Sequence, residues 1–412
     1  MSEALDVYLD QNLVGRLWQE RSIDGALLHF QYFQNWCDNP HAYPISMAMP
    51  LKEGAYSSDS VKTFIKELLP RDTLLKRLLS TGYSHGEGLI SLLHQYGWES
   101  AGAIRFQSAG HAWPAPSEPV ILTRPEWSKL SRKDLPKPIS VVASEVFEGR
   151  VKQILPGQQN KLGVAFQSNR VCIAFDGALS THIIKLGLSK CPHIAVNEAY
   201  CMLWAKALGV KVPDSFLIRD MYPVLCVKRY DRESGHAIHQ ESLGQAMGVL
   251  PDALSIKDCF LAIRQISTLP GQDQKSLLTW LIFNYLMGNT DISAKNINFI
   301  LSDQGPRLAP FCGLSSTAVY HSNVGEKMQW EIGGEFFENR LFKSHWEQFA
   351  EDIGVKPRLV FEIMASLCKK IKSKPVKYKV KLKTTLEENS LIERIYRDIQ
   401  KRAVKLEVYC NQ

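Results

Sequence analysis

Apolar and polar residues alternate at the start of the chain, with a spacing that is typical of strands. Asp6–Leu9 and Gly15–Trp18 predict a hairpin, and Leu27–Phe33 predicts a third strand. The spacing then becomes helical over Val61–Leu79, where Pro70 interrupts or restarts the helix. The N-terminal part of the chain therefore predicts a compact unit that contains both strands and helices.

A stretch rich in Pro, Ser and charged residues at 107–138 is typical of a connector. Beyond it, short β-branched segments come first and helical patterns dominate afterwards. This order predicts a small β-rich lobe over a larger helical lobe, and hence an α+β fold. The strand segments are Leu162–Ala165, Val171–Phe175, Thr181–Leu186, Phe216–Arg219, Val224–Tyr230 and Ile297–Leu301, and the helical ones are Asn197–Leu208 (with Gly209 as its C-cap), Leu243–Gly248, Ile256–Ile266, Lys275–Met287, His345–Ile353, Arg358–Ile371 and Leu386–Lys405.

Composition narrows the class of protein. The chain has 412 residues, 45% of them hydrophobic and 22% charged, which is usual for a globular protein. The longest apolar segment, Leu277–Met287, is too short for a membrane span and contains Asn284, so we expect no membrane segment. The nine cysteines form no C-x-x-C pair, which argues against a disulfide framework or a zinc site. We expect a cytoplasmic protein.

The net charge of +7 comes largely from one segment, Lys369–Lys383, which holds eight lysines. Such a segment can attract phosphates, including those of nucleic acids. It is also typical of a solvated loop or helix end, and the sequence leaves both interpretations open.

The strongest chemical signal is an Asp followed five residues later by an Asn, Asp291 and Asn296, between a hydrophobic helix and a strand. In protein kinases this spacing places a carboxylate at the attacking hydroxyl and an amide on a divalent ion. The bare pattern is common by chance, and its position after Lys275–Met287 makes it more specific.

Three weaker signals lie upstream. Lys185 ends an apolar strand, where it can neutralise nucleotide phosphates and pair with Glu198 on the next helix, or simply extend to water. The turn at Leu155–Leu162 can wrap phosphates through its backbone amides, although it holds only one glycine, Gly157. The segment Cys226–Arg232 suits either an adenine and ribose edge or a plain edge strand.

Together these residues resemble the HipA-type serine/threonine kinases, the toxins of bacterial HipA/HipB toxin–antitoxin modules. The resemblance extends over nearly the whole chain, and its ordered motifs make it specific. The matching segments are Ala42–Leu51, Phe64–Pro70, Gly97–Ala103, Pro156–Lys161, Thr181–Lys185, Asn197-Glu198, Leu208-Gly209, Arg229–Arg232, Ile238–Glu241, Asn284–Asp291, Ala294–Asn296, Leu308–Phe311 and Ile332–Glu335.

The resemblance implies a HipA-like kinase fold in four parts. They are an N-terminal α+β subdomain (1–106), a connector (107–138), a kinase N-lobe (139–237) and a helical C-lobe (238–412). It also implies ATP and Mg²⁺ as cofactors. The implied site residues are Gly157, Gln159, Lys161 and Lys185 at the phosphates, with Glu198 as the ion-pair partner of Lys185, Lys228 and Tyr230 at the adenine, Asp231 near the ribose, Asp291 as the catalytic carboxylate and Asn296 as a magnesium ligand.

Three positions depart from the family pattern. Gly313 stands where a second magnesium-binding aspartate is expected, and Asp303 nearby is a poor substitute because it lies in a predicted turn. Ile154 replaces a serine whose phosphorylation silences the kinase, so this switch is expected to be absent. Ser293 replaces a histidine of the catalytic loop.

The favoured hypothesis is a toxin-type kinase that phosphorylates serine or threonine on a protein, and the family implies an aminoacyl-tRNA synthetase as target. The alternative is a catalytically impaired pseudokinase that acts by binding, because the lost aspartate removes an anionic ligand of magnesium. A third hypothesis is a DNA-associated regulator. We expect a HipB-like antitoxin as partner and DNA contact only through it or through Lys369–Lys383.

Overall fold

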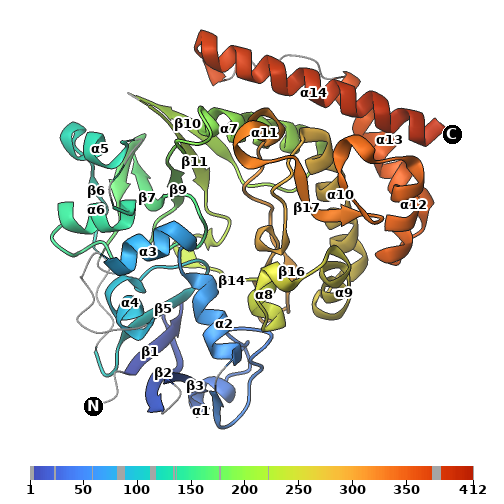
Figure 1. Cartoon of the computed structure of the whole chain (residues 1–412). Helices are drawn as coiled ribbons and strands as arrows, with labels where there is room; N and C mark the ends of the chain where they lie inside the picture. The colour runs from blue at the N-terminus through green and yellow to red at the C-terminus, as the bar shows by residue number, and fades with distance from the viewer. Residues whose placement is uncertain are drawn as a thin grey trace. The chain divides into compact units, whose positions relative to one another are not determined.

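The computed structural model describes residues 4–22, 25–57, 59–80, 89–111, 117–132, 135, 137–175, 178–220, 222–373 and 382–411. Figure 1 shows the whole chain with its helices and strands labelled. Contacts between its residues divide it into two compact units. The first unit comprises residues 1–186, 226–250 and 298–309, and the second comprises 187–225, 251–297 and 310–412. Because the chain passes between the units several times, the domain boundaries expected from the sequence stay a prediction.

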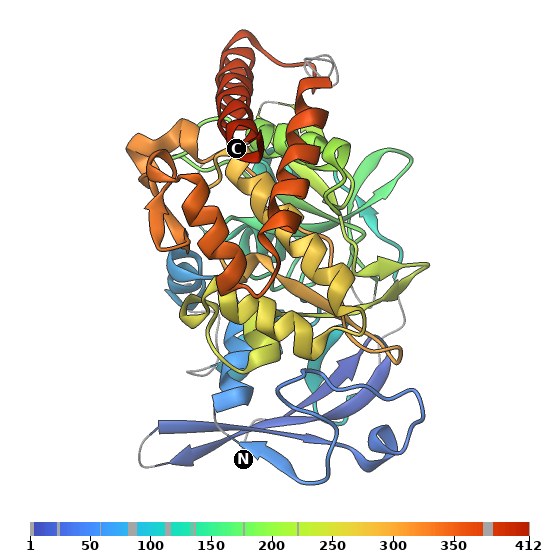
Figure 2. The same cartoon turned by 90° about the vertical axis from the view of Figure 1, so that its right-hand side faces the viewer.

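The first unit begins with a five-stranded sheet in the order β4-β3-β2-β1-β5. The predicted hairpin is confirmed, because β1 pairs antiparallel with β2, and β3 pairs with β2 in turn. These strands run side by side as the blue ribbons of Figure 2. The strands are β1 (Ala4–Leu9), β2 (Asn12–Ser22), β3 (Gly25–Tyr32), β4 (Ala55–Ser57) and β5 (Ile104–Ser108).

Helices cover this sheet with the apolar faces that the sequence predicts. The predicted break at Pro70 is confirmed, because α2 ends at Leu68 and α3 begins at Asp72. Phe64 and Ile65 of α2 are buried in one core with residues of β1 and β2, which removes apolar surface from water. The helices are α2 (Asp59–Leu68), α3 (Asp72–Ser80) and α4 (Leu89–Tyr96).

A second sheet of this unit carries the predicted Lys185 strand. Its strands β9 (His182–Lys185), β7 (Lys161–Gln167), β8 (Arg170–Ile173) and β6 (Val120–Ile121) lie in that order. A small sheet consists of β14 (His239–Ser242), β15 (Asn298–Leu301) and β16 (Arg307–Leu308), and α8 (Leu243–Met247) contacts it. Strand β15 confirms the strand predicted at Ile297–Leu301.

The region predicted as a connector, 107–138, contains a helix in its described part. It contains α5 (Arg124–Leu130), whose N-terminus is capped by Thr123 and Glu126, and it leads to α6 (Ile139–Val146). The Thr123 hydroxyl accepts from the Glu126 N–H at 3.4 Å, while the Glu126 carboxylate accepts from the Thr123 N–H at 2.7 Å. This capping box was a local signal that the composition of the segment obscured.

The second unit is mainly helical. Gly209 ends α7 with a φ of +90°, which confirms the predicted C-cap. The central helix α10 begins at Pro270, earlier than the apolar pattern suggests, because proline suits the first turn of a helix. The helices are α7 (Ile194–Leu208), α9 (Ile256–Ile266), α10 (Pro270–Met287), α11 (His321–Val324), α12 (Lys343–Asp352), α13 (Pro357–Ser373) and α14 (Leu386–Asn411).

Aromatic contacts hold these helices together. Trp280 of α10 stacks on Phe311 at 4.8 Å between ring centroids, and Trp204 of α7 stacks on Tyr396 of α14 at 6.4 Å. A hairpin, β17 (Lys327–Ile332) and β18 (Glu335–Phe337), was not predicted. Across the described ranges, no helix is both long and apolar enough to cross a membrane.

Candidate functional site

The predicted phosphate loop lies against the Lys185 strand in the first unit. Gly157 has a φ of +114°, and a Cβ there would lie 2.7 Å from Lys161 Nζ, so the position requires glycine. Lys161 Nζ donates to the Pro156 carbonyl at 2.9 Å. Gln159 Nε2 donates to the Leu186 carbonyl at 2.8 Å, which ties the loop to the residue after Lys185.

Two lysines meet on this sheet. Lys161 of β7 is the register partner of Lys185 of β9 in an antiparallel pair. Directly opposed residues of such a pair lie on the same face, with Cβ atoms about 5 Å apart. Lys185 is 7% exposed, so its ammonium group is largely shielded from water. Two close cations of this kind create a positive potential that suits a phosphate group.

The residue before this loop is structural. Ile154 is 1% exposed within the core of the first unit, and its N–H donates to the Glu99 carbonyl at 2.9 Å. On the other side, the Arg71 N–H donates to the Gly157 carbonyl at 3.1 Å. The start of the loop is therefore fixed from two sides, and position 154 offers a buried methyl surface where the resemblance expects a hydroxyl.

The residues predicted at the adenine and ribose occupy different environments. Lys228 is exposed. The pKa of His182 is lowered mainly by the burial of its own ring and further by the positive charge of Lys228. Tyr230 is half-buried and donates its hydroxyl to Gln240 Oε1. Asp231 is 3% exposed and accepts from the Gly102 N–H at 2.8 Å. It is therefore bonded to residues of its own unit.

Asp231 belongs to a buried charge network that sequence reasoning missed. Arg229 donates to both of its carboxylate oxygens, at 2.9 and 2.7 Å, and Arg232 lies 3.3 Å away. Both arginines also pair with Glu99, at 3.2 and 3.1 Å. Burial alone would raise the pKa of Asp231, but the two guanidinium groups outweigh it and hold that pKa well below its usual value. The alternation of Arg and Asp in Arg229–Arg232 was the available signal.

The predicted catalytic loop lies in the second unit and follows α10. Gly288 caps this helix with a φ of +66°. The Thr290 N–H donates to Thr317 Oγ1 at 2.7 Å, and Thr317 Oγ1 donates to the Gly288 carbonyl at 3.2 Å. Asp291 follows at once and is exposed. The loop is therefore anchored on its buried side, while Asp291 itself is accessible to solvent.

Neighbouring charges tune this carboxylate. Partial desolvation raises the pKa of Asp291, and the charge of Asp252 raises it further, while Lys295 lowers it. Lys295 Nζ pairs with Asp252 Oδ1 at 2.6 Å, which holds the far end of the loop. A carboxylate with a raised pKa is a better proton acceptor than an ordinary one.

Asn296 and Gly313 lie next to each other. A Cβ on Gly313 would lie 3.5 Å from Asn296 Nδ2, and apart from residues 312 and 314 no other described residue would come within 4 Å of it. Asn296 Oδ1 accepts from the Ser293 N–H at 3.1 Å. Ser293 therefore holds the Asn296 side chain through its backbone. Asp303, the acid nearest in sequence to position 313, contacts His41 at 3.1 Å within the first unit.

These residues fit a magnesium ion only in part. Mg²⁺ takes oxygen ligands and is commonly bound through one or two carboxylates together with substrate phosphates. The Asn296 Oδ1 atom keeps a second lone pair, and Asp291 lies on the same loop. Among the residues that the structure describes, no group of three or more His, Cys, Asp or Glu side chains can hold a metal. The donor set suits an ion that arrives with a nucleotide.

A further contact behind the loop was not predicted. Asn197 of α7 donates to the Ser316 carbonyl at 2.9 Å and accepts from the Ser316 N–H at 2.8 Å. This fixes the segment that leads from Gly313 to Thr317. Glu198, the next residue of α7, is buried in the second unit, whereas Lys185 belongs to the first. Their ion pair stays a prediction.

The chain is similar to known proteins along most of its length. The model of the HipA N-terminal domain matches residues 5–107, and that of the HipA-like C-terminal domain matches 154–374. A putative kinase, Y4mE of Sinorhizobium fredii, is 30% identical over 86% of this chain and 87% of its own length. The serine/threonine-protein kinase toxin HipA of Shewanella oneidensis is 25% identical over 89% and 87%.

The fold is also shared with a solved structure, the Shewanella oneidensis toxin–antitoxin complex of HipA, HipB and operator DNA. The two chains superpose with a TM-score of 0.82 over 99% of each, at 21% identity. The α+β kinase-like fold expected from the sequence is confirmed. With both domain models matched in order along one chain and the fold in common, this protein belongs to the HipA family.

Proposed function

We propose that this protein is an ATP-dependent serine/threonine protein kinase that transfers the γ-phosphoryl group to a protein. The observation that carries the proposal is the catalytic loop, where Asp291 stands exposed on a buried, hydrogen-bonded base and Asn296 lies beside position 313. The relatives named as kinases support it.

The proposed chemistry assigns a function to each part of the site. The oxygen of the substrate hydroxyl forms a bond to the γ-phosphorus while Asp291 accepts the hydroxyl proton. ADP leaves with the electrons of the broken P–O bond. Lys161 and Lys185 neutralise the phosphates, aided by the backbone at Gly157 and by Gln159, and Glu198 orients Lys185. Lys228 and Tyr230 face the adenine, with Asp231 near the ribose. Asn296 would hold Mg²⁺, which when bound offsets phosphate charge.

The partners follow from the relatives. The similar Shewanella oneidensis protein is a toxin in a complex with HipB and operator DNA. We propose a HipB-like antitoxin for this chain, with DNA reached only through that partner, and a cytoplasmic protein substrate such as an aminoacyl-tRNA synthetase.

A catalytically impaired binding module is the second candidate, because Gly313 leaves open space where a carboxylate would reach the side chain of Asn296. In this case the protein would bind a nucleotide or a partner without transferring phosphate.

Transfer of radiolabel from [γ-³²P]ATP to purified synthetases separates the two candidates, with Asp291→Ala as the control. We expect label on a serine or threonine in the wild type and at least a thousandfold less in Asp291→Ala. Calorimetric titration with ATP should show tighter binding with Mg²⁺ than without. Binding without any transfer would favour the impaired module, and equal label in the control would contradict the assignment of Asp291.

A further inference from the structure

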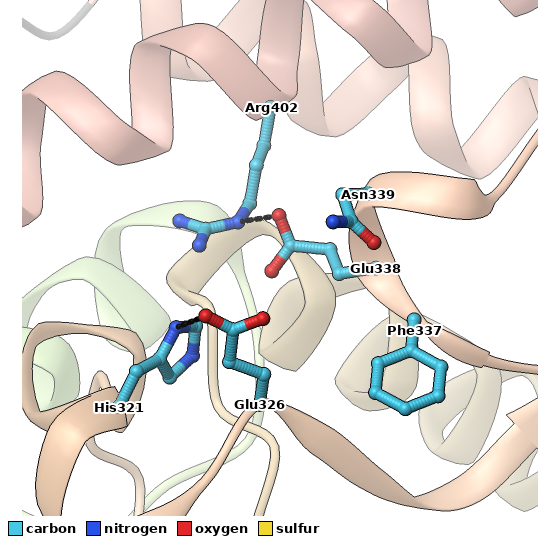
Figure 3. Close-up of a pocket in the computed structure, with 6 residues that line it drawn as sticks. All are labelled: His321, Glu326, Phe337, Glu338, Asn339 and Arg402. Atoms are coloured by element: carbon cyan, nitrogen blue, oxygen red, sulfur yellow. Dashed lines mark hydrogen bonds and ion pairs between the residues drawn. The ribbon is translucent and has the colours of Figure 1, made fainter.

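A pocket of about 180 Å³ opens beside the catalytic loop, within the second unit. It is lined by His321, Glu326, Phe337, Glu338, Asn339 and Arg402. Figure 3 shows Arg402 reaching from α14 toward Glu338, with His321 and Glu326 below. At roughly 30 Å³ per water molecule, the pocket holds about six waters or one small polar ion with its hydration.

Arg402 stands out among these residues because it is 8% exposed and only partly satisfied. Its Nε donates to Glu338 Oε1 at 2.6 Å. Its Nη1 is buried and has no hydrogen-bond partner among the described residues. A charged group rarely stays buried in this way unless its position serves another purpose.

The guanidinium group of Arg402 packs against the start of the catalytic loop. A Cβ on Gly288 would lie 2.5 Å from Arg402 Nη2, 2.7 Å from its Cζ and 2.8 Å from the Ala318 Cβ. Gly288 therefore leaves just enough room for the guanidinium group and Ala318 to meet the backbone. Gly288 ends α10, and a cation is favourable at the negative C-terminal end of a helix.

Asp291 lies only three residues beyond Gly288. The Gly288 carbonyl also accepts from Thr317 Oγ1 at 3.2 Å and from the Ala318 N–H at 2.9 Å. The start of the loop is thus held by the segment 317–318 through hydrogen bonds and by Arg402 through packing. Removing the guanidinium group would open space beside Gly288 and leave the Glu338 carboxylate without its ion-pair partner.

We propose that Arg402, contributed by the C-terminal helix α14, is a positioning residue for the catalytic loop. The adjoining pocket lets small cations reach the space that the guanidinium group occupies, once a substitution has emptied it. The expected change in kcat rests on the proposed kinase function, whereas the expected effect on the order of the loop does not depend on it. A misplacement of Asp291 by about 1 Å can lower a rate about a hundredfold. The nucleotide-binding lysines lie on other elements, so the loss should fall on kcat.

The test compares Arg402→Ala with Arg397→Ala, an exposed arginine on the same helix. In full-length protein we expect kcat to fall at least thirtyfold in Arg402→Ala, with the KM for ATP changed less than threefold, and both constants unchanged in Arg397→Ala. Guanidinium chloride at about 20 mM, too dilute to unfold a domain, should restore at least fivefold of kcat, while equal NaCl should not. Unchanged kcat, or a loss that guanidinium does not relieve, would overturn the proposal.

Hydrogen–deuterium exchange gives a readout that needs no activity. We expect faster amide exchange at residues 288–296 in Arg402→Ala, a smaller increase in Glu338→Gln, and unchanged exchange within α10. If the wild type transfers no phosphate, the proposed function fails but the exchange result still decides the position of Arg402. Equal exchange in Arg402→Ala, Arg397→Ala and wild type would sink the inference.

Discussion

The candidate site residues fall into two groups, a strand half in the first unit and a loop half in the second, and the two are built by different means. Lys161 and Lys185 lie on paired strands, so backbone hydrogen bonds of β7 and β9 set their position. Asp291 and Asn296 lie on a loop that depends on side-chain hydrogen bonds, chiefly from Thr317. A strand ladder tolerates most single substitutions, whereas a loop of this kind depends on a few polar groups.

The two groups of residues also differ in what their proposed roles require, positive charge in one and exact placement in the other. For its proposed role at the phosphates, the strand half needs positive charge at roughly the right place, which a strand provides without support from distant residues. For its proposed role in catalysis, the loop half needs a carboxylate at one position, and its support comes from α7, the 316–318 segment and α14. We therefore expect substitutions in the first half to act through nucleotide binding and those in the second to act through turnover.

The largest effect is expected for Lys185→Met, which removes the shielded ammonium group and keeps a side chain of similar length. We expect kcat/KM for ATP to fall about a thousandfold, or about 4 kcal/mol of barrier. Steady-state kinetics and ATP calorimetry would measure the loss.

The matched control is Lys152→Met, an exposed lysine of the same unit. It should leave the kinetics unchanged, and the melting temperatures of both variants should stay close to that of the wild type. A Lys185→Met enzyme within threefold of the wild type would remove the strand half from the site.

A gain of function is expected at position 313. Gly313→Asp places a carboxylate beside Asn296 and should raise the transfer rate about thirtyfold while lowering the Mg²⁺ concentration for half-maximal rate. The backbone φ of +73° opposes any side chain there, at a cost of about 1–2 kcal/mol, although Asp tolerates this region better than most residues.

Gly313→Ala carries the same backbone strain without the carboxylate and is the matched control. It should be no faster than the wild type. If Gly313→Asp and Gly313→Ala behave alike in both rate and Mg²⁺ dependence, the missing aspartate does not limit this protein.

Much of the fold could be predicted from the sequence because its signals are local. The β1–β2 hairpin, the break at Pro70 and the Gly209 cap each depend on residues within a few positions of one another. The spacing of Asp291 and Asn296 is equally local, and the structure places both on one loop after α10. The assigned chemistry of the site residues stays a prediction.

The supports of the site could not be predicted in the same way. Asn197 and Ser316 are 119 positions apart, and Arg402 reaches Gly288 from a helix that reads as an ordinary amphipathic one. A polar pair of this kind has no period and no flanking signal, so only folded coordinates reveal it. The buried network of Glu99 with Arg229 and Arg232 was missed because Glu99 lies 130 positions from Arg229, although the charges of Arg229–Arg232 hinted at it.

The smallest effect is expected behind the loop, for Thr317→Val. The substitution keeps the shape of the side chain but removes the oxygen that accepts from the Thr290 N–H and donates to the Gly288 carbonyl. A buried N–H left without a partner costs about 1–3 kcal/mol, so urea unfolding should show a loss of about 2 kcal/mol and kcat should fall about tenfold. Thr279→Val is the control, because its exposed hydroxyl bonds only to the Lys275 carbonyl in its own helix and water can replace it. Equal stability and turnover in the two variants would mean that side-chain hydrogen bonds do not hold the loop half, and the contrast with the strand half would then be lost.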